Sequence, residues 1–497
     1  MRRILLINWD NYPHFATGGV YTWAKSLVDN AKDWEFIVFN QLSNANASAK
    51  YQVPQNVRRV IGLPVFGTHR CEEYYPENGP FLPKISRTTD KVIELEFVPL
   101  YRRFLAGVLA DECDPRALAQ VVHELHQFLT VYDAKKCFEH GTVWDAFLDR
   151  VTSDDLYKEM KIREALLNFQ VIQRSLQVLS IRLPKVEIIH SSLAWLPALA
   201  GVAAKIESKC PLVITEHGVA FRELLLYYNM FLYNEISKLF WTVFTRNIIR
   251  TIYESSDMII PVCHANKVWE TKLGADESRI RVIYNGVDTQ RFRPIQVQRN
   301  DERPTVVSVG RVSVFKDIIG LIQATGYVRE EVPNVRTLVF GEATELEYSA
   351  KCTSMVHKLH LEENFKLMGG TKEPEKAYAR ADVVAFSSIT EAFPFAVIEA
   401  MACGKAVVAT DVGGVREALE RCGLLVRSRS PHDLANAIIM LLKDRELRTR
   451  FETAAIARAR DKFRLEDSVR QYREVYDRLA SHEDSDPRRQ APIAVSR

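Results

Sequence analysis

Short apolar runs rich in β-branched residues alternate with helical patterns in both halves of the chain, and this alternation limits the possible folds more than any other feature. It is typical of parallel sheets covered by helices. The predicted strands are residues 3–8, 34–40, 57–61, 186–190, 212–216, 258–262 and 281–284 in the first half, and 305–309, 337–340, 365–368, 383–387, 406–409 and 424–426 in the second. The sequence therefore predicts an α/β protein with two doubly wound, Rossmann-like parallel sheets.

A polar segment without periodicity, residues 286–304, separates the two sets of strands and is typical of an interdomain linker. We predict an N-terminal domain at 1–295, a C-terminal domain at 303–460, a helix at 461–480 that packs back toward the N-terminal domain, and a disordered tail at 481–497. Residues 64–184 interrupt the strand alternation, so we expect a largely helical insertion there, with helices at 100–110, 116–131 and 154–180. One further amphipathic or core helix is expected at 224–245. Ligands of open parallel sheets bind beyond the carboxyl ends of the strands, so two such domains are expected to face a cleft.

Charge and cysteine usage exclude several classes of protein. Lysine and arginine number 66 against 63 aspartates and glutamates, so the net charge of +3 gives no general attraction to nucleic acid or anionic membranes. The eight cysteines show neither a C-x-x-C pair nor metal-finger spacing, which favours a reducing cytosol over a disulfide framework. No apolar stretch is long and clean enough to predict a membrane span. The G-x-G-x-x-G, P-loop and G-x-S-x-G motifs are also absent, which disfavours hydride transfer, ATP hydrolysis and the commonest hydrolases.

Two glutamates follow the predicted strand at 383–387. Glu391 lies at the approach to a predicted helix and Glu399 lies within it, with Pro394 expected in the first turn and Gly404 at the end. Eight residues of helix span roughly 12 Å. That distance suits one elongated ligand with hydroxyls at two places, because carboxylates accept charge-assisted hydrogen bonds. Taken alone, the pair is weak evidence, and solvated helix charges explain it better.

Two cations follow the strand at 305–309, in the segment Gly310-Arg311-Val-Ser-Val-Phe-Lys316-Asp317. Arginine presents a fork to phosphate oxygens and lysine a mobile charge, so Arg311 and Lys316 suit a diphosphate, although a surface cap has the same pattern. Gly18 and Gly19 follow the first strand, where backbone amides at a helix start can approach an anion. A simple turn explains the two glycines equally well.

Two more loops are expected at the carboxyl ends of strands. Thr215-Glu216-His217-Gly218 follows one strand, and the glycine beside His217 leaves room for a ligand, although a lone histidine there is often structural. Asp411-Val-Gly413-Gly414-Val-Arg416-Glu417 follows another.

Together with Asn285-Gly286-Val287-Asp288, these motifs closely resemble the family 4 retaining glycosyltransferases of GT-B fold, over about residues 1–62 and 186–475. The long insertion and Arg222-Glu223 after the histidine motif are most similar to the Pel exopolysaccharide glycosyltransferases of that family. The late loop departs from the family pattern, which often has Ile-Pro-Glu after the two glycines where this chain has Val415-Arg416-Glu417.

The resemblance implies that Arg311 and Lys316 hold the donor diphosphate, Glu399 the ribose and Glu391 the sugar hydroxyls. It also implies that His217 lies beside the transferred sugar, with Gly18 and Gly19 near the phosphate. The expected catalytic residues are thus Glu391, His217, Arg311 and Lys316, and the expected donor-binding residues are Gly18, Gly19, Arg311, Lys316, Glu391 and Glu399.

We expect a hexosyltransferase that moves a hexose from a nucleoside-diphosphate sugar, with uridine favoured by the resemblance, to a glycan or lipid-linked acceptor in exopolysaccharide biosynthesis. No cofactor or metal is expected, since the D-x-D match of the sequence, Asp484-Ser485-Asp486, lies in the predicted tail. The expected location is the cytoplasm, at the inner face of the membrane, with a membrane-bound partner and no nucleic acid. Two alternatives stay open at this stage: a GT-B nucleotide-sugar epimerase or hydrolase, and a noncatalytic nucleotide-sugar-binding subunit of a polysaccharide assembly.

Overall fold

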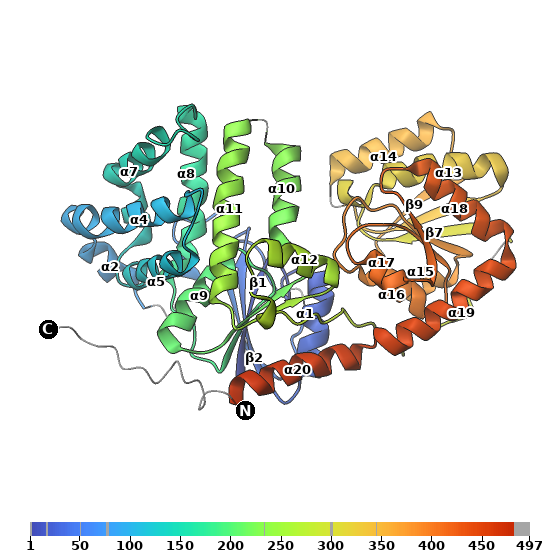
Figure 1. The fold of residues 1–497 in the computed structure, drawn as a ribbon, viewed down its shortest axis with the longest axis horizontal. Coiled ribbons are helices and arrows are strands. Elements are labelled where there is room, and N and C mark those ends of the chain that lie inside the picture. The colour runs from blue at the N-terminus through green and yellow to red at the C-terminus, as the bar shows by residue number, and fades with distance from the viewer. Residues whose placement is uncertain are drawn as a thin grey trace. The chain divides into compact units, whose positions relative to one another are not determined.

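The computed structural model describes residues 2–15, 18–49, 51–75, 79–232, 234–298, 302–343 and 345–481 (Figure 1). The chain forms two compact units. Unit 1 contains residues Met1–Pro261, Lys267–Arg281 and Gln471–Arg497, and unit 2 contains Val262–Asn266 and Val282–Arg470. Each unit is described by itself below. Residues 482–497, which include the D-x-D match and nearly all of the predicted tail, lie outside the described residues.

Unit 1 is built on a six-stranded sheet in the order β3-β2-β1-β4-β5-β6, with every neighbouring pair parallel. The strands are β1 (Arg3–Trp9), β2 (Glu35–Leu42), β3 (Val57–Pro64), β4 (Ile188–Ser191), β5 (Leu212–Glu216) and β6 (Met258–Pro261). Most of their residues are buried because helices cover both faces, as the continuous apolar runs predict. The strand order reverses between β1 and β4, which is the switch point at which open sheets bind ligands.

The helices of unit 1 outside the insertion are α1 (Gly19–Asn30), α9 (Leu196–Ser208), α10 (Ala220–Phe231) and α11 (Glu235–Ser255), together with α12 (His264–Lys272) from Lys267 onward. Because side chains alternate across a strand, Leu5 and Ile7 point to the face that packs against α9 and the insertion, in one large apolar cluster. The single helix expected at 224–245 is wrong. Instead, α10 ends at Phe231 and α11 begins after its N-cap Asn234, whose side chain accepts the backbone N–H groups of Ile236 and Ser237.

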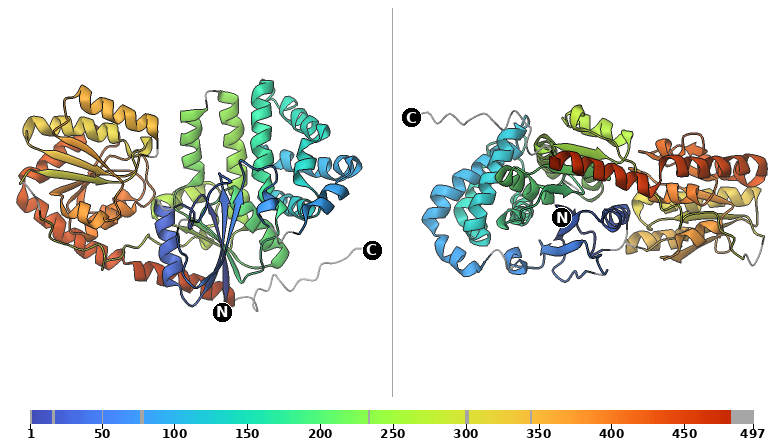
Figure 2. Two further views of the ribbon diagram at one scale, coloured as in Figure 1. Left: turned by 180° about the vertical axis from the view of Figure 1, so that it is seen from behind. Right: turned by 90° about the horizontal axis from the view of Figure 1, so that it is seen from below.

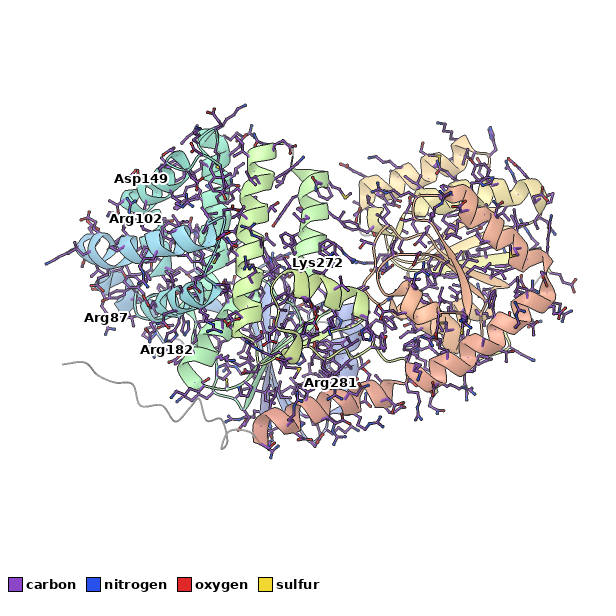
Figure 3. All side chains as sticks on the ribbon, in the orientation of Figure 1. Arg87, Arg102, Asp149, Arg182, Lys272 and Arg281 are labelled. Atoms are coloured by element: carbon purple, nitrogen blue, oxygen red, sulfur yellow. The ribbon has the colours of Figure 1, made fainter. Side chains whose placement is uncertain are left out.

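The insertion of unit 1 is helical and gathers beside α9 and α11 (Figures 1 and 2). Its helices are α2 (Phe81–Arg87), α3 (Asp90–Val92), α4 (Val98–Val108), α5 (Pro115–Val131), α6 (Ala134–Glu139), α7 (Gly141–Thr152) and α8 (Ile162–Leu176). On its outer side, Arg102 of α4 and Asp149 of α7 form an ion pair of 2.7 Å (Figure 3). The helix expected at 154–180 starts too early, because residues 155–159 form turns and α8 begins only at Ile162.

Unit 2 repeats the same topology, with six parallel strands in the order β12-β11-β10-β7-β8-β9. They are β7 (Thr305–Val309), β8 (Arg336–Phe340), β9 (Phe365–Gly369), β10 (Val383–Phe386), β11 (Val407–Thr410) and β12 (Gly423–Val426). The helices are α13 (Ile318–Glu331), α14 (Leu346–Lys358), α15 (Pro374–Ala379), α16 (Phe395–Ala402), α17 (Val415–Leu419), α18 (Pro431–Lys443) and α19 (Arg445–Lys462). The prediction of two doubly wound parallel sheets is thereby confirmed.

Two apolar clusters lie on opposite faces of the second sheet. Val307 and Val384 pack with α15, α16 and α17, whereas Val306 and Val383 pack with α13, α14 and α18 (Figure 1). The strand order reverses between β7 and β10, which are hydrogen-bonded neighbours. The loops that follow these two strands therefore leave the sheet side by side, at its switch point.

The strand predicted at 281–284 is wrong. The chain there forms no strand, and only the neighbouring Ile280 makes an isolated bridge, to Ile259. The last helix, α20 (Leu465–Ser481), is assigned to unit 1 from Gln471 onward. There, Arg281 donates to Glu474 at 2.7 Å (Figure 3). None of the helices in the described part of the chain combines the length and the apolar character needed to cross a membrane.

Candidate active site

Lys316 and Glu391 come together at the switch point of unit 2. Lys316 ends a short 3-10 turn between β7 and α13, and Glu391 lies in the loop after β10. The Lys316 ammonium donates to Oε1 of Glu391, and the two side chains are only 28% and 13% exposed. The hydroxyl of Ser388 donates to the same Glu391 oxygen at 2.6 Å. The site therefore holds one carboxylate between a cation and a hydroxyl, partly shielded from water.

The loop that carries Lys316 is tied to the end of β10 by backbone contacts. The Ser387 hydroxyl lies 2.8 Å from the carbonyl oxygen of Lys316 and 2.9 Å from that of Asp317, and the N–H of Ile389 donates to the Phe315 carbonyl at 2.8 Å. Asp317, with φ of 46°, then starts α13 by accepting the N–H of Gly320. These bonds fix the position of the lysine before any ligand binds.

The Gly413-Gly414 loop after β11 supports Glu391 from the other side. A Cβ atom at Gly413, where φ is 54°, would lie 1.8 Å from the Glu391 carbonyl oxygen, so only glycine allows this approach. The N–H of Gly414 donates to the Ala392 carbonyl at 2.6 Å. The Gly413-Gly414 loop thus packs directly against the backbone of Glu391 and Ala392 and fixes its position.

Glu399 lies within α16 and is partly buried. The hydroxyl of Tyr378, from α15, donates to its Oε2 at 3.1 Å. Burial raises the pKa of Glu399 to about 7, and the bond from Tyr378 opposes that shift. Because α16 begins at Phe395, with Pro394 as its N-cap rather than in its first turn, Glu391 is not helical and the 12 Å helical spacing does not apply.

Arg311 follows β7 and is exposed, and within the described part of the chain its guanidinium has no hydrogen-bond or ion-pair partner. Among the described residues, Arg311 thus supplies an unpaired cation in the same loop as Lys316. The structure thus groups Arg311, Lys316, Glu391 and Glu399 in unit 2, while His217, Gly18 and Gly19 belong to unit 1.

His217 follows β5 in unit 1, and its ring stands edge-on to Trp23 of α1, with centroids 4.5 Å apart. Both ring nitrogens are buried and have no hydrogen-bond partner among the described residues. Burial lowers the pKa of His217 to about 3, so the imidazole is neutral at physiological pH. A neutral ring with unused nitrogens can donate to or accept from a ligand hydroxyl.

A layer of buried polar groups lies around Trp23. Nδ1 of His190 bonds the Tyr476 hydroxyl at 2.7 Å and Nε2 bonds the Thr215 hydroxyl at 2.8 Å. Tyr472, from the same helix as Tyr476, packs on Trp23 with ring centroids 5.7 Å apart. The last helix, α20, thus packs against the Trp23 ring that contacts His217.

Two buried carboxyl groups lie near His217 or its neighbour in the chain: Glu216 directly precedes it, and Glu270 is close to Glu216. Burial raises the pKa of Glu216 to about 8, although Tyr253 donates to it at 2.8 Å. Glu270 of α12 is fully buried, with no partner for either oxygen among the described residues, and burial with the nearby Glu216 raises its pKa to about 9. Both groups are therefore neutral near pH 7.

Gly18 is the N-cap of α1, with φ of 102°, and nothing lies within 4 Å of the position of a Cβ atom there. Gly18 and Gly19 are exposed, and the first turn of α1 has no acidic residue and no side-chain cap. The helix start is thus open to an anion. Thr17, which precedes it, lies outside the described residues.

The late loop has a structural role that the sequence did not indicate. Glu417 accepts the N–H groups of His264 and Ala265 at 2.8 and 2.7 Å and the Tyr284 hydroxyl at 3.0 Å. Arg416 is paired with Asp411. Sequence reasoning also missed Ser388, Tyr378 and Trp23. Ser388 stands inside the glutamate motif, whereas nothing in the sequence marks the other two.

No group of three or more His, Cys, Asp or Glu side chains in the described ranges is placed to hold a metal ion. The D-x-D match at Asp484 and Asp486 lies outside those ranges.

Comparison with known proteins assigns both parts of the chain. Residues 2–278 match the family model described as "Domain of unknown function (DUF3492)", and residues 289–458 match "Glycosyl transferases group 1". The first model covers more than half of the chain, so the chain belongs to that family, and its second part is a group 1 glycosyl transferase domain.

Curated relatives include a synthase and several glycosyltransferases. N-acetyl-alpha-D-glucosaminyl L-malate synthase of Bacillus anthracis is 27% identical over 241 residues, which is 46% of this chain and 62% of the relative. D-inositol 3-phosphate glycosyltransferase of Nocardia farcinica is 32% identical over 202 residues, 37% of this chain and 45% of the relative. The chain thus spans about half the length of these curated relatives.

Solved structures share the fold over nearly the whole chain. Sucrose-phosphate synthase from Thermosynechococcus elongatus has a TM-score of 0.64 at 19% identity, covering 97% of this chain and 100% of the other. HepE of Anabaena has a TM-score of 0.60 at 18% identity, covering 96% and 100%. The predicted GT-B fold is confirmed by these neighbours and by the family match.

Proposed function

We propose that this protein is a retaining glycosyltransferase that moves a hexose from a nucleoside-diphosphate sugar to a glycan acceptor in exopolysaccharide biosynthesis. The observation that carries the proposal is the Lys316–Glu391–Ser388 cluster at the switch point of a group 1 glycosyl transferase domain. An ammonium, with an accessible arginine five residues earlier in the chain, suits a diphosphate, and a carboxylate four residues before a helix suits sugar hydroxyls.

Arg311 and Lys316 act on the leaving group. When the bond between the sugar C1 and the diphosphate oxygen breaks, its electron pair stays on the phosphate, so negative charge develops there. Two cations aimed at that charge before the reaction lower the barrier electrostatically. The ties from Ser387 to the loop of Lys316 keep this cation in place and reduce the reorganisation that the reaction needs.

Glu391 changes partners when the donor enters. Without donor it neutralises Lys316, whereas a diphosphate competes for the same ammonium and frees the carboxylate to accept hexose hydroxyls. Glu399, whose Oε2 accepts the Tyr378 hydroxyl, accepts ribose hydroxyls of the same donor. Binding of the diphosphate and grip on the sugar are therefore linked.

His217, Gly18 and Gly19 serve from unit 1. The neutral His217 ring has nitrogens free for a hydroxyl of the transferred sugar, and the open start of α1 offers N–H groups to a phosphate. The acceptor hydroxyl forms its bond to C1 on the face that the diphosphate leaves, and its proton passes to a diphosphate oxygen. This path needs no protein nucleophile and no metal, and it retains the anomeric configuration.

The donor base and the pathway rest on resemblance. The motifs resemble the Pel exopolysaccharide glycosyltransferase PelF, which favours a UDP-sugar, a cytoplasmic location at the inner membrane face and a membrane-bound partner. HepE of Anabaena, which shares the fold, has been crystallised with UDP and with UDP-glucose. UDP-glucose is therefore the first donor to test, with glycans or lipid-linked sugars as acceptors.

The test is nucleotide release from a panel of UDP-, GDP- and ADP-sugars by the wild type, Arg311→Ala and Glu391→Ala. Lys443 and Glu331 form an exposed ion pair of 2.7 Å elsewhere in unit 2, so Lys443→Ala and Glu331→Ala are matched controls. We expect the site variants to lose turnover and the controls to keep it. Equal turnover in all variants contradicts the site. Product analysis with and without acceptor separates transfer from epimerisation or hydrolysis, and binding without turnover of any donor indicates a noncatalytic subunit.

A further inference from the structure

Tyr378 is a fully buried tyrosine whose hydroxyl reaches the candidate donor site. It lies in α15, and its hydroxyl oxygen is 3.1 Å from Oε2 of Glu399 and 3.1 Å from the carbonyl oxygen of Ala396. A phenol has one proton to donate. The hydroxyl can therefore serve either as a support for the carboxylate or as a cap for the backbone of α16.

The carboxylate of Glu399 is held at one oxygen only. Among the described residues, Tyr378 is the single hydrogen-bond donor to its side chain, and that bond goes to Oε2. Oε1 has no partner there, and the side chain is partly exposed. Oε2 is thus held by Tyr378, while Oε1 is available to a ligand.

The surroundings explain why an anchor matters. Burial disfavours the charged form of Glu399 and raises its pKa to about 7, Glu375 of α15 adds to this, and Arg291 opposes it. Arg291 is itself paired with Glu375 at 3.0 Å, and Cys403 and Lys405 follow at the end of α16. A hydrogen bond from Tyr378 stabilises the ionised carboxylate in this setting.

We infer that Tyr378 is a positioning residue for nucleotide recognition: by holding Oε2 of Glu399, it directs Oε1 to accept the ribose hydroxyls of the donor. This inference rests on the proposed function, which assigns Glu399 to the ribose. It adds a selectivity: the site distinguishes a ribonucleoside diphosphate from one without the 2′ and 3′ hydroxyls, and that distinction depends on Tyr378.

The test compares UDP with 2′,3′-dideoxyuridine diphosphate by isothermal titration calorimetry at pH 8. Tyr378→Phe keeps the buried ring and removes only the hydroxyl. We expect its affinity for UDP to fall about tenfold while its affinity for the dideoxy compound stays unchanged, because a hydrogen bond to a charged group is lost. Tyr228→Phe is the matched control, since Tyr228 is buried in unit 1 and its hydroxyl bonds Thr245 at 2.8 Å. It should bind both ligands as the wild type does.

A second variant covers the case in which Tyr378→Phe does not fold. Glu399→Asp leaves Tyr378 in place and withdraws the carboxylate from it, and we expect the same loss of discrimination. The pH profile gives an independent readout: discrimination by the wild type should rise as pH passes about 7, when Glu399 ionises, and loss of the Tyr378 bond should move that midpoint to higher pH.

The outcomes distinguish the positioning role of Tyr378 from the proposed function. Equal UDP affinity in Tyr378→Phe and wild type, equal weakening of both ligands, or full discrimination by Glu399→Asp overturns the positioning role alone. A wild type that binds UDP, GDP or ADP without distinguishing the matching dideoxy compound also overturns that role and leaves donor binding standing. A wild type that binds none of the three overturns the proposed function, and the positioning role with it.

Discussion

Gly413→Ala tests whether the late glycine loop sets the position of Glu391. The added Cβ would lie 1.8 Å from the Glu391 carbonyl oxygen and 2.8 Å from its carbonyl carbon, both of them backbone atoms that no rotamer change can move away. Real Cβ atoms essentially never come closer than 3.0 Å, so the two loops must part by more than 1 Å. The carboxylate that Lys316 and Ser388 hold then shifts as well.

The magnitude follows from two terms. An L-residue in the left-handed region costs about 1–2 kcal/mol, and overpacking a tight contact costs about 1–3 kcal/mol, so unit 2 should lose about 2–5 kcal/mol of stability. Because misplacing a reactive group by about 1 Å can cost roughly 10²-fold in rate, we expect donor turnover to fall by that order at temperatures where the variant is still folded.

The assay combines urea unfolding, followed by circular dichroism, with nucleotide release from the donor that the wild type uses. Gly369→Ala is the matched control: Gly369 also lies in unit 2 and has a φ of 74°, but nothing lies within 4 Å of its Cβ position. This control should lose about 1–2 kcal/mol of stability and keep its turnover. Wild-type turnover in folded Gly413→Ala, or an equal loss of turnover in Gly369→Ala, would refute the reasoning.

Three further outcomes are expected. Ser388→Ala removes the 2.6 Å bond to Glu391 and should lower turnover about tenfold with little change in UDP affinity, measured by nucleotide release and calorimetry. Glu391→Ala should strengthen UDP binding several-fold while turnover falls, whereas Lys316→Ala should weaken UDP binding. Calorimetry measures both affinities. If both variants change UDP affinity in the same direction, Glu391 does not compete with the diphosphate for Lys316. Glu270→Gln should stabilise unit 1 at pH 8 and flatten its pH dependence. The folded carboxyl keeps its proton up to about pH 9, while the unfolded chain releases it near 4.5, so wild-type stability declines across that window by up to about 1.4 kcal/mol per pH unit. Urea unfolding at pH 5 and pH 8 checks this, and an unchanged slope contradicts it.

The strands were predictable because parallel strands buried on both faces are continuous apolar runs, whatever their neighbours. The same reasoning failed at residues 281–284, where Ile283 is buried but hydrogen bonding to β6 stops at the N–H of Arg281, beside the isolated Ile280 bridge. An apolar pattern reports burial, and hydrogen bonding in a sheet is a separate condition. It failed again at Asn234, where a single capping side chain divides an apolar stretch into two helices.

The residues of the candidate donor site were predictable from the sequence, but their geometry was predictable only in part. Lys316 and Glu391 each follow a strand, but their contact depends on β7 and β10 being neighbours, and strand order is not written in local sequence. The contribution of Tyr378 depends on how α15 packs beneath α16, which involves no motif at all. Glu417 is the opposite case: it lies in a loop that the sequence marks as a motif, yet its carboxylate accepts the backbone N–H groups of His264 and Ala265 and so has a structural role.

Under the proposed function, the paired charges would also explain how a chain with a net charge of only +3 binds a dianion. Before the donor arrives, Glu391 cancels Lys316, so the partly buried lysine carries no uncompensated charge and needs no strongly basic surface around it. If a diphosphate takes the ammonium as proposed, the displaced carboxylate would acquire hydroxyl donors from the same ligand. A nucleoside diphosphate without a sugar offers no such donors, so it leaves Glu391 without its partner. The pair should therefore favour the intact donor over the spent nucleotide, which is the direction that product release requires.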